Sequence, residues 1–244
     1  MIPLVAVAHG SRDPRSAATI SSLVDVVRAL RPGLDARVSF LDLSAPRLGD
    51  VLAGLRGEVV VVPLLLGRAY HAKVDVPALI HEACQRSPRL SVTVSDVLGP
   101  DPRLESAALR RLTTAGAQFN DPSLGVILAG AGSSDARANA TVAAIARRWR
   151  VQAGWAGAVE AFAAAAKPDV PQAVATLRAR GATRIAVASW FLAPGLLPDR
   201  IYDAAQSLDP DAIIADPLGP DPDVAELILH RYDEALRASL EHTG

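Results

Sequence analysis

The chain is poor in several residue types, and each shortage excludes a class of protein. Its 244 residues include one cysteine, Cys84, which rules out an internal disulfide framework and a thiolate metal cluster. The formal net charge is −1, only two of the 25 basic residues are lysine, and no basic run favours nucleic acid. No apolar run approaches the roughly 20 residues of a membrane span. The N-terminal residues also lack the basic flank and cleavage site of a signal peptide. We therefore expect a soluble cytoplasmic protein without a nucleic-acid or membrane partner.

What the chain does contain is an internal repeat. Four features recur in the same order, each between 120 and 126 positions apart. They are Gly10-Ser11 with Gly132-Ser133, Phe40 and Pro46 with Phe162 and Pro168, the apolar run 59–66 with 185–192, and the identical segment Leu-Gly-Pro-Asp-Pro at 98–102 and 218–222. This order predicts two related modules, an N-terminal one over 1–118 and a C-terminal one over 119–244.

Short apolar runs rich in valine alternate with helical patterns in both halves. Continuous rather than alternating apolar runs are typical of parallel strands that are buried on both faces. The expected strands lie near 3–8, 36–41, 59–66, 92–94, 125–129, 156–162, 184–191 and 212–215. The expected helices lie near 15–30, 47–55, 77–85, 103–115, 137–150, 171–180, 198–207 and 224–240. The alternation predicts an α/β fold in which each module is a four-stranded parallel sheet flanked by helices.

Three polar residues of the first module have apolar counterparts in the second. His9 aligns with Ala131, Asp42 with Ala164, and His71 with Leu197. Each polar residue follows one of the first three expected strands, and ligands of such sheets bind at the carboxyl ends of the strands. The sequence therefore predicts a functional site at this edge of the first sheet.

The residue types at this edge suit metal and proton chemistry. Two histidines and a carboxylate form a plausible ligand set for Fe²⁺, Co²⁺, Ni²⁺ or Zn²⁺. Histidine titrates near neutral pH, so it can bind metal when neutral and accept a proton at the same pH. In contrast, Gly10, Ser11 and Asp13 recur in the second copy, which favours a turn and helix-capping role for them.

The motifs resemble those of the sirohydrochlorin chelatase family, of the CbiX/SirB type, in its long form with two fused modules. The segments that carry the resemblance are 7–14 (Val-Ala-His-Gly-Ser-Arg-Asp-Pro), 40–46 (Phe-Leu-Asp-Leu-Ser-Ala-Pro), 63–71 (Pro-Leu-Leu-Leu-Gly-Arg-Ala-Tyr-His) with 75–77 (Asp-Val-Pro), and 98–102. The resemblance implies insertion of Co²⁺ or Fe²⁺ into sirohydrochlorin, for cobalamin or siroheme synthesis, in a cleft between the modules. His9 and His71 are implied to bind the metal and accept pyrrole protons, with Asp42 assisting. The family often has glutamate at the position of Asp42.

The resemblance also implies which partners the chain has. Sirohydrochlorin is the small-molecule substrate, the divalent metal is a second substrate with Ni²⁺ also compatible, and no prosthetic group is expected. A fused pair of modules permits a monomer or a weak homodimer. Because the tetrapyrrole is a polycarboxylate, polar and basic residues near the strand ends are candidates to bind it, and Trp190 is a candidate for an apolar wall. The full set of substrate-binding candidates is Ser11, Arg12, Arg15, Arg68, Lys73, Ser133, Ser134, Trp190 and Arg200.

Two other functions fit some of these residues. Ser11, His9 and Asp42 could serve a hydrolase, although the Gly-x-Ser-x-Gly pattern and a Walker loop are absent from the sequence. The same ligands could also serve a carrier that binds tetrapyrrole or metal without turnover.

Overall fold

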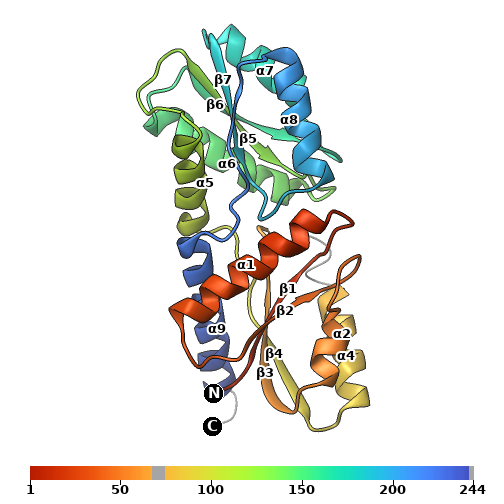
Figure 1. Cartoon of the computed structure of the whole chain (residues 1–244). Coiled ribbons are helices and arrows are strands. Elements are labelled where there is room, and N and C mark those ends of the chain that lie inside the picture. The colour runs from red at the N-terminus through yellow and green to blue at the C-terminus, as the bar shows by residue number, and fades with distance from the viewer. Residues whose placement is uncertain (68–74, 242–244) are drawn as a thin grey trace. The chain divides into compact units, whose positions relative to one another are not determined.

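The chain folds into two compact α/β units, each with its own parallel sheet (Figure 1). The structure is a computed structural model that describes residues 1–67 and 75–241. Unit 1 comprises Met1–Arg103 and Gly219–Gly244, and unit 2 comprises Leu104–Leu218.

The sheet of unit 1 has four strands in the order β2-β1-β3-β4, and every pairing is parallel. The strands are β1 (Leu4–Ala8), β2 (Ala36–Phe40), β3 (Gly57–Pro63) and β4 (Leu90–Val94). All five residues of the central strand β1 are buried, because helices cover both faces of the sheet. This burial explains why the strand appears in the sequence as an uninterrupted apolar run.

Four helices belong to unit 1 within the residues that the structure describes. They are α1 (Pro14–Leu30), α2 (Leu48–Ala53), α4 (Asp75–Arg86) and α9 (Pro222–Glu241). Helix α1 begins after Asp13, whose side chain accepts a hydrogen bond of 2.9 Å from the amide of Arg15. Its buried residues Ile20, Leu23, Val24 and Val27 follow the i, i+3, i+4, i+7 spacing of an amphipathic helix. Helices α2 and α4 pack their apolar faces with Val5, Val7 and Val61 of the sheet.

Unit 2 repeats this arrangement, with a parallel sheet in the order β6-β5-β7-β8. Its strands are β5 (Leu124–Gly130), β6 (Gly157–Phe162), β7 (Arg184–Ser189) and β8 (Ile213–Ile214). Its helices are α5 (Pro102–Thr114), α6 (Ala136–Gln152), α7 (Val170–Ala179) and α8 (Leu196–Leu208). Every expected strand and helix is present within a few residues of its expected bounds, so the predicted α/β architecture with two four-stranded parallel sheets is confirmed.

The compact units differ from the sequence halves 1–118 and 119–244 at two helices. Helix α5 of the first half belongs to unit 2 from Leu104 onward, whereas helix α9 at the end of the second half belongs to unit 1. Both helices follow the same Leu-Gly-Pro-Asp-Pro turn, so local sequence gives no sign of which sheet each will cover.

Helix α9 is held against unit 1 by polar contacts as well as apolar packing. Asp233 accepts two hydrogen bonds from the guanidinium of Arg31, at 2.6 and 2.8 Å, where α1 ends. Arg231 donates to the carbonyl oxygen of Val97 at 2.9 Å, and the buried hydroxyl of Tyr232 donates to the carbonyl oxygen of Ile2. The helix therefore closes one face of a sheet whose strands come from the opposite end of the sequence.

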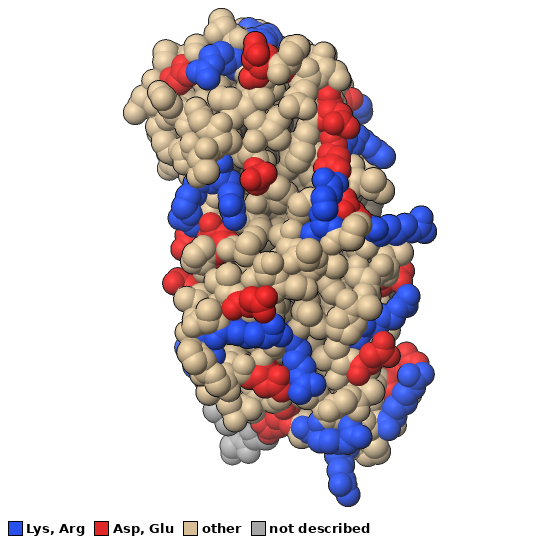
Figure 2. All heavy atoms as spheres, in the orientation of Figure 1, with Lys and Arg blue, Asp and Glu red and all other residues tan. Residues whose placement is uncertain are grey.

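Charged side chains of both signs are interspersed on the face drawn in Figure 2. Many charged side chains of the described residues form ion pairs, such as Arg37 with Asp35 and Arg178 with Asp209. Across 1–67 and 75–241, none of the helices combines the length and the hydropathy that a membrane crossing requires.

Candidate functional site

The loops that follow β1 and β2 lie side by side at the carboxyl edge of the first sheet. The amide of Leu41 donates to the carbonyl oxygen of Ala8 at 2.9 Å, and the amide of Asp42 donates to that of His9 at 3.0 Å. The parallel ladder thus continues past the two strands into their loops. This geometry brings His9 and Asp42 together, as the strand assignment predicts.

Both of these residues are exposed to solvent. The Asp42 carboxylate forms an ion pair of 3.3 Å with Arg47, and the two side chains are 58% and 61% exposed. Such an exposed pair contributes little to stability. Because more than half of the Asp42 side chain is exposed, its carboxylate is accessible for interaction with a ligand.

A glycine at position 10 allows the two loops to approach so closely. Gly10 has a φ of +96°, and a Cβ atom there would lie 1.7 Å from the carbonyl oxygen of Asp42. Any other residue would push the loop of Asp42 away from that of His9.

The second unit has the same backbone without the polar residues. The amide of Ala164 donates to the carbonyl oxygen of Ala131 at 3.0 Å. Gly132 has a φ of +83°, and a Cβ atom there would lie 1.9 Å from the carbonyl oxygen of Ala164. The sequence alignment of His9 with Ala131 and of Asp42 with Ala164 is therefore correct in three dimensions. The backbone is a shared scaffold on which only unit 1 carries an imidazole and a carboxylate at these positions.

Ser11 and Asp13 have the scaffold role that their repetition predicts. The hydroxyl oxygen of Ser11 accepts a hydrogen bond from the amide of Asp13 at 3.1 Å, and Ser133 does the same for Asp135 at 3.0 Å. Asp13 caps α1 and also binds the guanidinium of Arg15, which holds the pKa of the Asp13 carboxyl below its usual range. The Arg15 guanidinium is thus engaged by a carboxylate of its own loop.

The other substrate-binding candidates have different environments. Arg12 and Ser134 are exposed, and Arg200 is exposed with its guanidinium donating to the carbonyl oxygen of Ala163 at 3.3 Å. Trp190 is only 5% exposed, so its ring presents little surface to a ligand in this structure. His71, Arg68 and Lys73 lie outside the described residues, and the alignment of His71 with Leu197 stays a prediction.

Within 1–67 and 75–241, no group of three or more histidine, cysteine, aspartate or glutamate side chains is arranged to hold a metal ion. His9 and Asp42 supply two such groups at one edge of the sheet. A metal site of the predicted kind therefore depends on a further ligand from elsewhere, and His71 is the predicted one.

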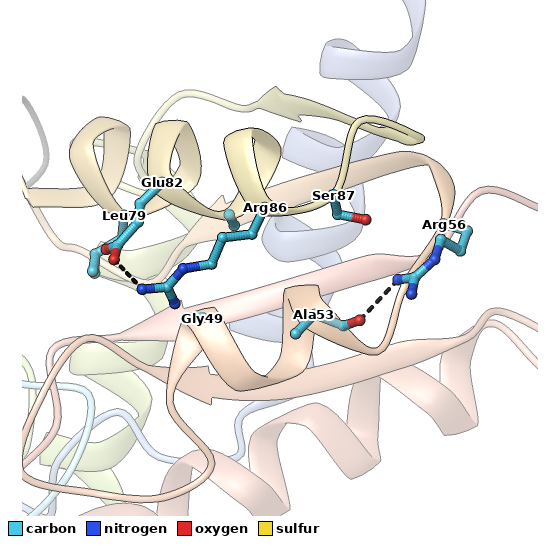
Figure 3. Close-up of a pocket in the computed structure, with 8 residues that line it drawn as sticks. Gly49, Ala53, Arg56, Leu79, Glu82, Arg86 and Ser87 are labelled. Atoms are coloured by element: carbon cyan, nitrogen blue, oxygen red, sulfur yellow. Dashed lines mark hydrogen bonds and ion pairs between the residues drawn. The ribbon is translucent and has the colours of Figure 1, made fainter.

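A pocket of about 120 Å³ lies elsewhere in unit 1, between α2 and α4 (Figure 3). Its arginines are already engaged, Arg86 with Glu82 and Arg56 with the carbonyl oxygen of Ala53. Arg56 immediately precedes β3 and Ser87 lies three residues before β4, so the pocket lies toward the amino edge of the sheet. None of the predicted site residues lines it.

One residue at the carboxyl edge has no place in the sequence-based prediction. The hydroxyl of Ser44 accepts a hydrogen bond from the amide of Ser11 at 3.1 Å and donates to the carbonyl oxygen of Ser11 at 2.9 Å. Its counterpart in the repeat is Ala166. The sequence signal was available, because Ser44 is a further polar residue that the second copy lacks.

Comparison with known proteins supports the duplicated reading of the chain. The family model CbiX matches it twice, over residues 3–115 and 125–235. A sirohydrochlorin ferrochelatase of Priestia megaterium is 26% identical over 240 residues, which cover 94% of this chain and 89% of that protein. A sirohydrochlorin cobaltochelatase of the same organism is 26% identical over 208 residues, covering 81% of this chain and 66% of that protein.

Solved structures share the fold across the whole length. SirB from Bacillus subtilis with Fe³⁺ superimposes with a TM-score of 0.78 at 24% identity and covers 96% of both chains. A CbiX structure described as the terminal enzyme for biosynthesis of siroheme in denitrifying bacteria has a TM-score of 0.69 at 20% identity, over 96% of this chain and 99% of that one. Together with the duplicated family match, which covers most of the sequence, this places the chain in the CbiX family.

Proposed function

We propose that this chain inserts a divalent metal ion, Co²⁺ or Fe²⁺, into sirohydrochlorin. The observation that carries the proposal is the contrast between the two copies of the CbiX unit. Both keep the same loop backbone at the sheet edge, yet only the first keeps His9 and Asp42 where the second has Ala131 and Ala164. Relatives along nearly the whole chain are named sirohydrochlorin ferrochelatase and cobaltochelatase.

The reaction requires groups that bind a cation and accept protons at neutral pH. Insertion exchanges two pyrrole N–H protons for one divalent cation, so the ring keeps its charge and two protons are released. His9 and His71 are proposed to bind the incoming metal in their neutral form and to accept the pyrrole protons. Asp42, whose amide is bonded to the carbonyl of His9, is proposed to stabilise the imidazolium that forms.

The substrate-binding role is proposed for residues near the two sheet edges. Among those that the structure describes, the exposed ones are Arg12, Arg15, Ser134 and Arg200, which suit a polycarboxylate that approaches from solvent. Sirohydrochlorin is the proposed partner, the cytoplasm the proposed location, and a monomer or weak homodimer the proposed state.

The experiment that tests this function is an anaerobic insertion assay with purified protein. Sirohydrochlorin is mixed with Co²⁺, Fe²⁺ or Ni²⁺, and the absorbance change is compared with spontaneous insertion at the same metal concentration. Multiple turnovers above the spontaneous rate with at least one metal are expected. A rate equal to the spontaneous one with all three metals would overturn the proposal.

The same assay separates the two alternatives. A carrier would bind sirohydrochlorin or Co²⁺ in a fixed ratio and show no turnover. For a serine hydrolase the Ser11 hydroxyl would be the nucleophile. That hydroxyl instead accepts a hydrogen bond from the main-chain amide of Asp13, and Ser133 makes the same contact with Asp135 in the unit without the histidine. Ser11→Ala is therefore expected to leave much of the insertion rate intact.

A further inference from the structure

We propose that Ser44 is a positioning residue that holds the loop of His9 against the loop of Asp42. The role deepens the function proposed above and rests on it, because it concerns the geometry of the same two side chains. Ser44 lies on the loop after β2, and its hydroxyl binds both the amide and the carbonyl oxygen of Ser11 on the loop after β1. A single side chain thus takes both hydrogen-bonding groups of a residue in the neighbouring loop.

The Ser44 contact is the second of two connections between these loops. The first is the backbone hydrogen bond of 3.0 Å from Asp42 to His9. Gly10 and Leu43 lie between the two connections, and both have positive φ angles, +96° and +61°. The loops are therefore joined on both sides of their bends, directly beside the imidazole and the carboxylate.

In the second unit, the amide and carbonyl groups of Ser133, the counterpart of Ser11, bind a different side chain. Ala166 stands at the position of Ser44, and Asn139 stands at the position of Ala17. The Asn139 side chain accepts from the amide of Ser133 at 2.9 Å and donates to its carbonyl oxygen at 2.7 Å. Asn139 lies on α6, the helix that directly follows the Ser133 loop, so this contact does not link the two loops.

The difference between the two units distinguishes two roles of the Ser44 hydroxyl: to satisfy the backbone groups of Ser11, and to join the two loops. Gly132 and Ala165 keep positive φ angles of +83° and +57° without a side chain that joins their loops. The bends therefore form without the cross-loop contact, and Asn139 shows that a local side chain can satisfy the exposed backbone groups. What the Ser44 contact adds is restraint of one loop by the other, and it occurs in the unit that carries His9 and Asp42.

Restraint of this kind affects rate more than stability. Proton acceptance and metal transfer depend on the separation of the reacting groups, and a displacement of about 1 Å can cost roughly 100-fold in rate. Deleting the part-buried hydroxyl of Ser44 removes two hydrogen bonds and no buried apolar surface, so a Ser44→Ala variant is expected to fold.

The test compares Ser44→Ala with two matched variants. Ser44→Ala is expected to lower the insertion rate roughly tenfold or more at saturating metal and sirohydrochlorin, and Ser44→Thr, which keeps the hydroxyl, is expected to restore most of it. Ser39→Ala is the control, because the Ser39 hydroxyl also links β2 to β1, donating to the carbonyl oxygen of Ala6 at 3.2 Å away from the loops. It is expected to keep the wild-type rate. An unchanged rate in Ser44→Ala would overturn the proposal.

A second variant transplants the contact of the other unit. Ser44→Ala combined with Ala17→Asn offers Ser11 the local partner that Asn139 offers Ser133. We expect thermal stability to recover while the insertion rate stays low, because the link between the loops is still missing. Recovery of the wild-type rate would show that Ser44 only satisfies the backbone of Ser11, and the positioning role would be wrong.

Amide hydrogen exchange supplies a readout that does not depend on activity. In Ser44→Ala, amide exchange is expected to speed up at Ser11, which loses its partner. It is also expected to speed up at Asp42, whose amide hydrogen bond to the carbonyl oxygen of His9 is the other connection between the loops. Adding Ala17→Asn to Ser44→Ala is expected to slow exchange again at Ser11 but not at Asp42. Unchanged exchange at Asp42 in Ser44→Ala would overturn the coupling of the loops, whether or not the wild-type chain inserts metal. Absence of insertion by the wild type would instead count against the proposed function.

Discussion

The amide of Asp42 donates a hydrogen bond of 3.0 Å to the carbonyl oxygen of His9, although 32 residues separate them in the chain. The bond continues the parallel pairing of β1 with β2 beyond the last ladder pair, Ala8 with Phe40. Two residues with the side chains for metal and proton chemistry are thereby held at neighbouring positions by a contact that neither of their side chains makes. Their side chains can consequently be changed without removing the contact that places them.

His9→Ala is expected to lower the insertion rate by roughly 100-fold or more, because a proton acceptor and metal ligand is lost. The fold is expected to stay intact, since Ala131 occupies the same loop position in unit 2. The anaerobic absorbance assay measures the rate, and circular dichroism checks the fold. His81→Ala is the control, because His81 is an exposed histidine on α4 outside the candidate site. Insertion at the wild-type rate by His9→Ala would remove His9 from the reaction.

Asp42→Ala is expected to lower the insertion rate by roughly 10- to 100-fold, the range found when a carboxylate that supports a histidine is removed. Asp42→Asn, which keeps the size but not the charge, should lose nearly as much if the charge is what matters. Arg47→Ala removes the ion pair while leaving the carboxylate, and it is expected to change the rate little. If Arg47→Ala and Asp42→Ala had equal effects, the ion pair rather than the carboxylate would be responsible.

Gly10→Ala is expected to lower the free energy of unfolding by more than about 3 kcal/mol, because the new Cβ meets both strain and a clash. The atom would lie 1.7 Å from the carbonyl oxygen of Asp42. Gly33→Ala is a matched control, since Gly33 has a φ of +87° and open space around its Cβ position. That control carries only the strain of a left-handed residue, about 1–2 kcal/mol. Urea unfolding compares the two variants, and equal losses would show that close approach of the loops is not the constraint.

Asp233→Asn is expected to destabilise the protein at neutral pH by about 1 kcal/mol, a value kept small because both partners of the ion pair are partly exposed. The hydrogen bonds from Arg31 lower the pKa of the Asp233 carboxyl in the folded state. The stabilisation is therefore present above the unfolded-state pKa of about 3.9 and disappears as the pH falls through the lower folded value.

Urea unfolding between pH 7 and pH 3 measures this difference, and the curves of wild type and Asp233→Asn should converge toward the acidic end. Asp25→Asn serves as the control, because its pair with Arg28 on the same helix α1 is more exposed and should contribute less. A difference that persisted unchanged at the acidic end would mean that the lost ion pair is not its cause.

Sequence patterns predicted the elements well because the physical signals are local. Buried parallel strands require uninterrupted apolar runs, and β1 and β5 are buried along their whole length. Helix starts are visible for a similar reason, since Asp13 and Asp135 cap α1 and α6 with the same contact to the residue two positions later. The apolar runs and the capping residues both depend on neighbours in the chain, so they can be recognised without knowledge of the fold.

The environment of Trp190 was beyond the reach of these signals. An apolar residue at the end of a strand could face a ligand or the core, and the sequence pattern is the same in both cases. In the structure the amide of Trp190 still bonds to the carbonyl oxygen of Ala129 at 2.7 Å, which extends the strand pairing by one residue. Its side chain is buried.

The sequence by itself determined the duplication, the alternation of strands and helices, and the position of His9 and Asp42 after neighbouring strands of the first sheet. Tertiary structure alone decided which sheet α5 and α9 cover and which side chain joins the loops of His9 and Asp42. The physical reason is that periodicity records how much of a residue is buried, but not which partner buries it. The hydroxyl of Ser44 and the carboxylate of Asp233 acquire their roles only when distant segments meet.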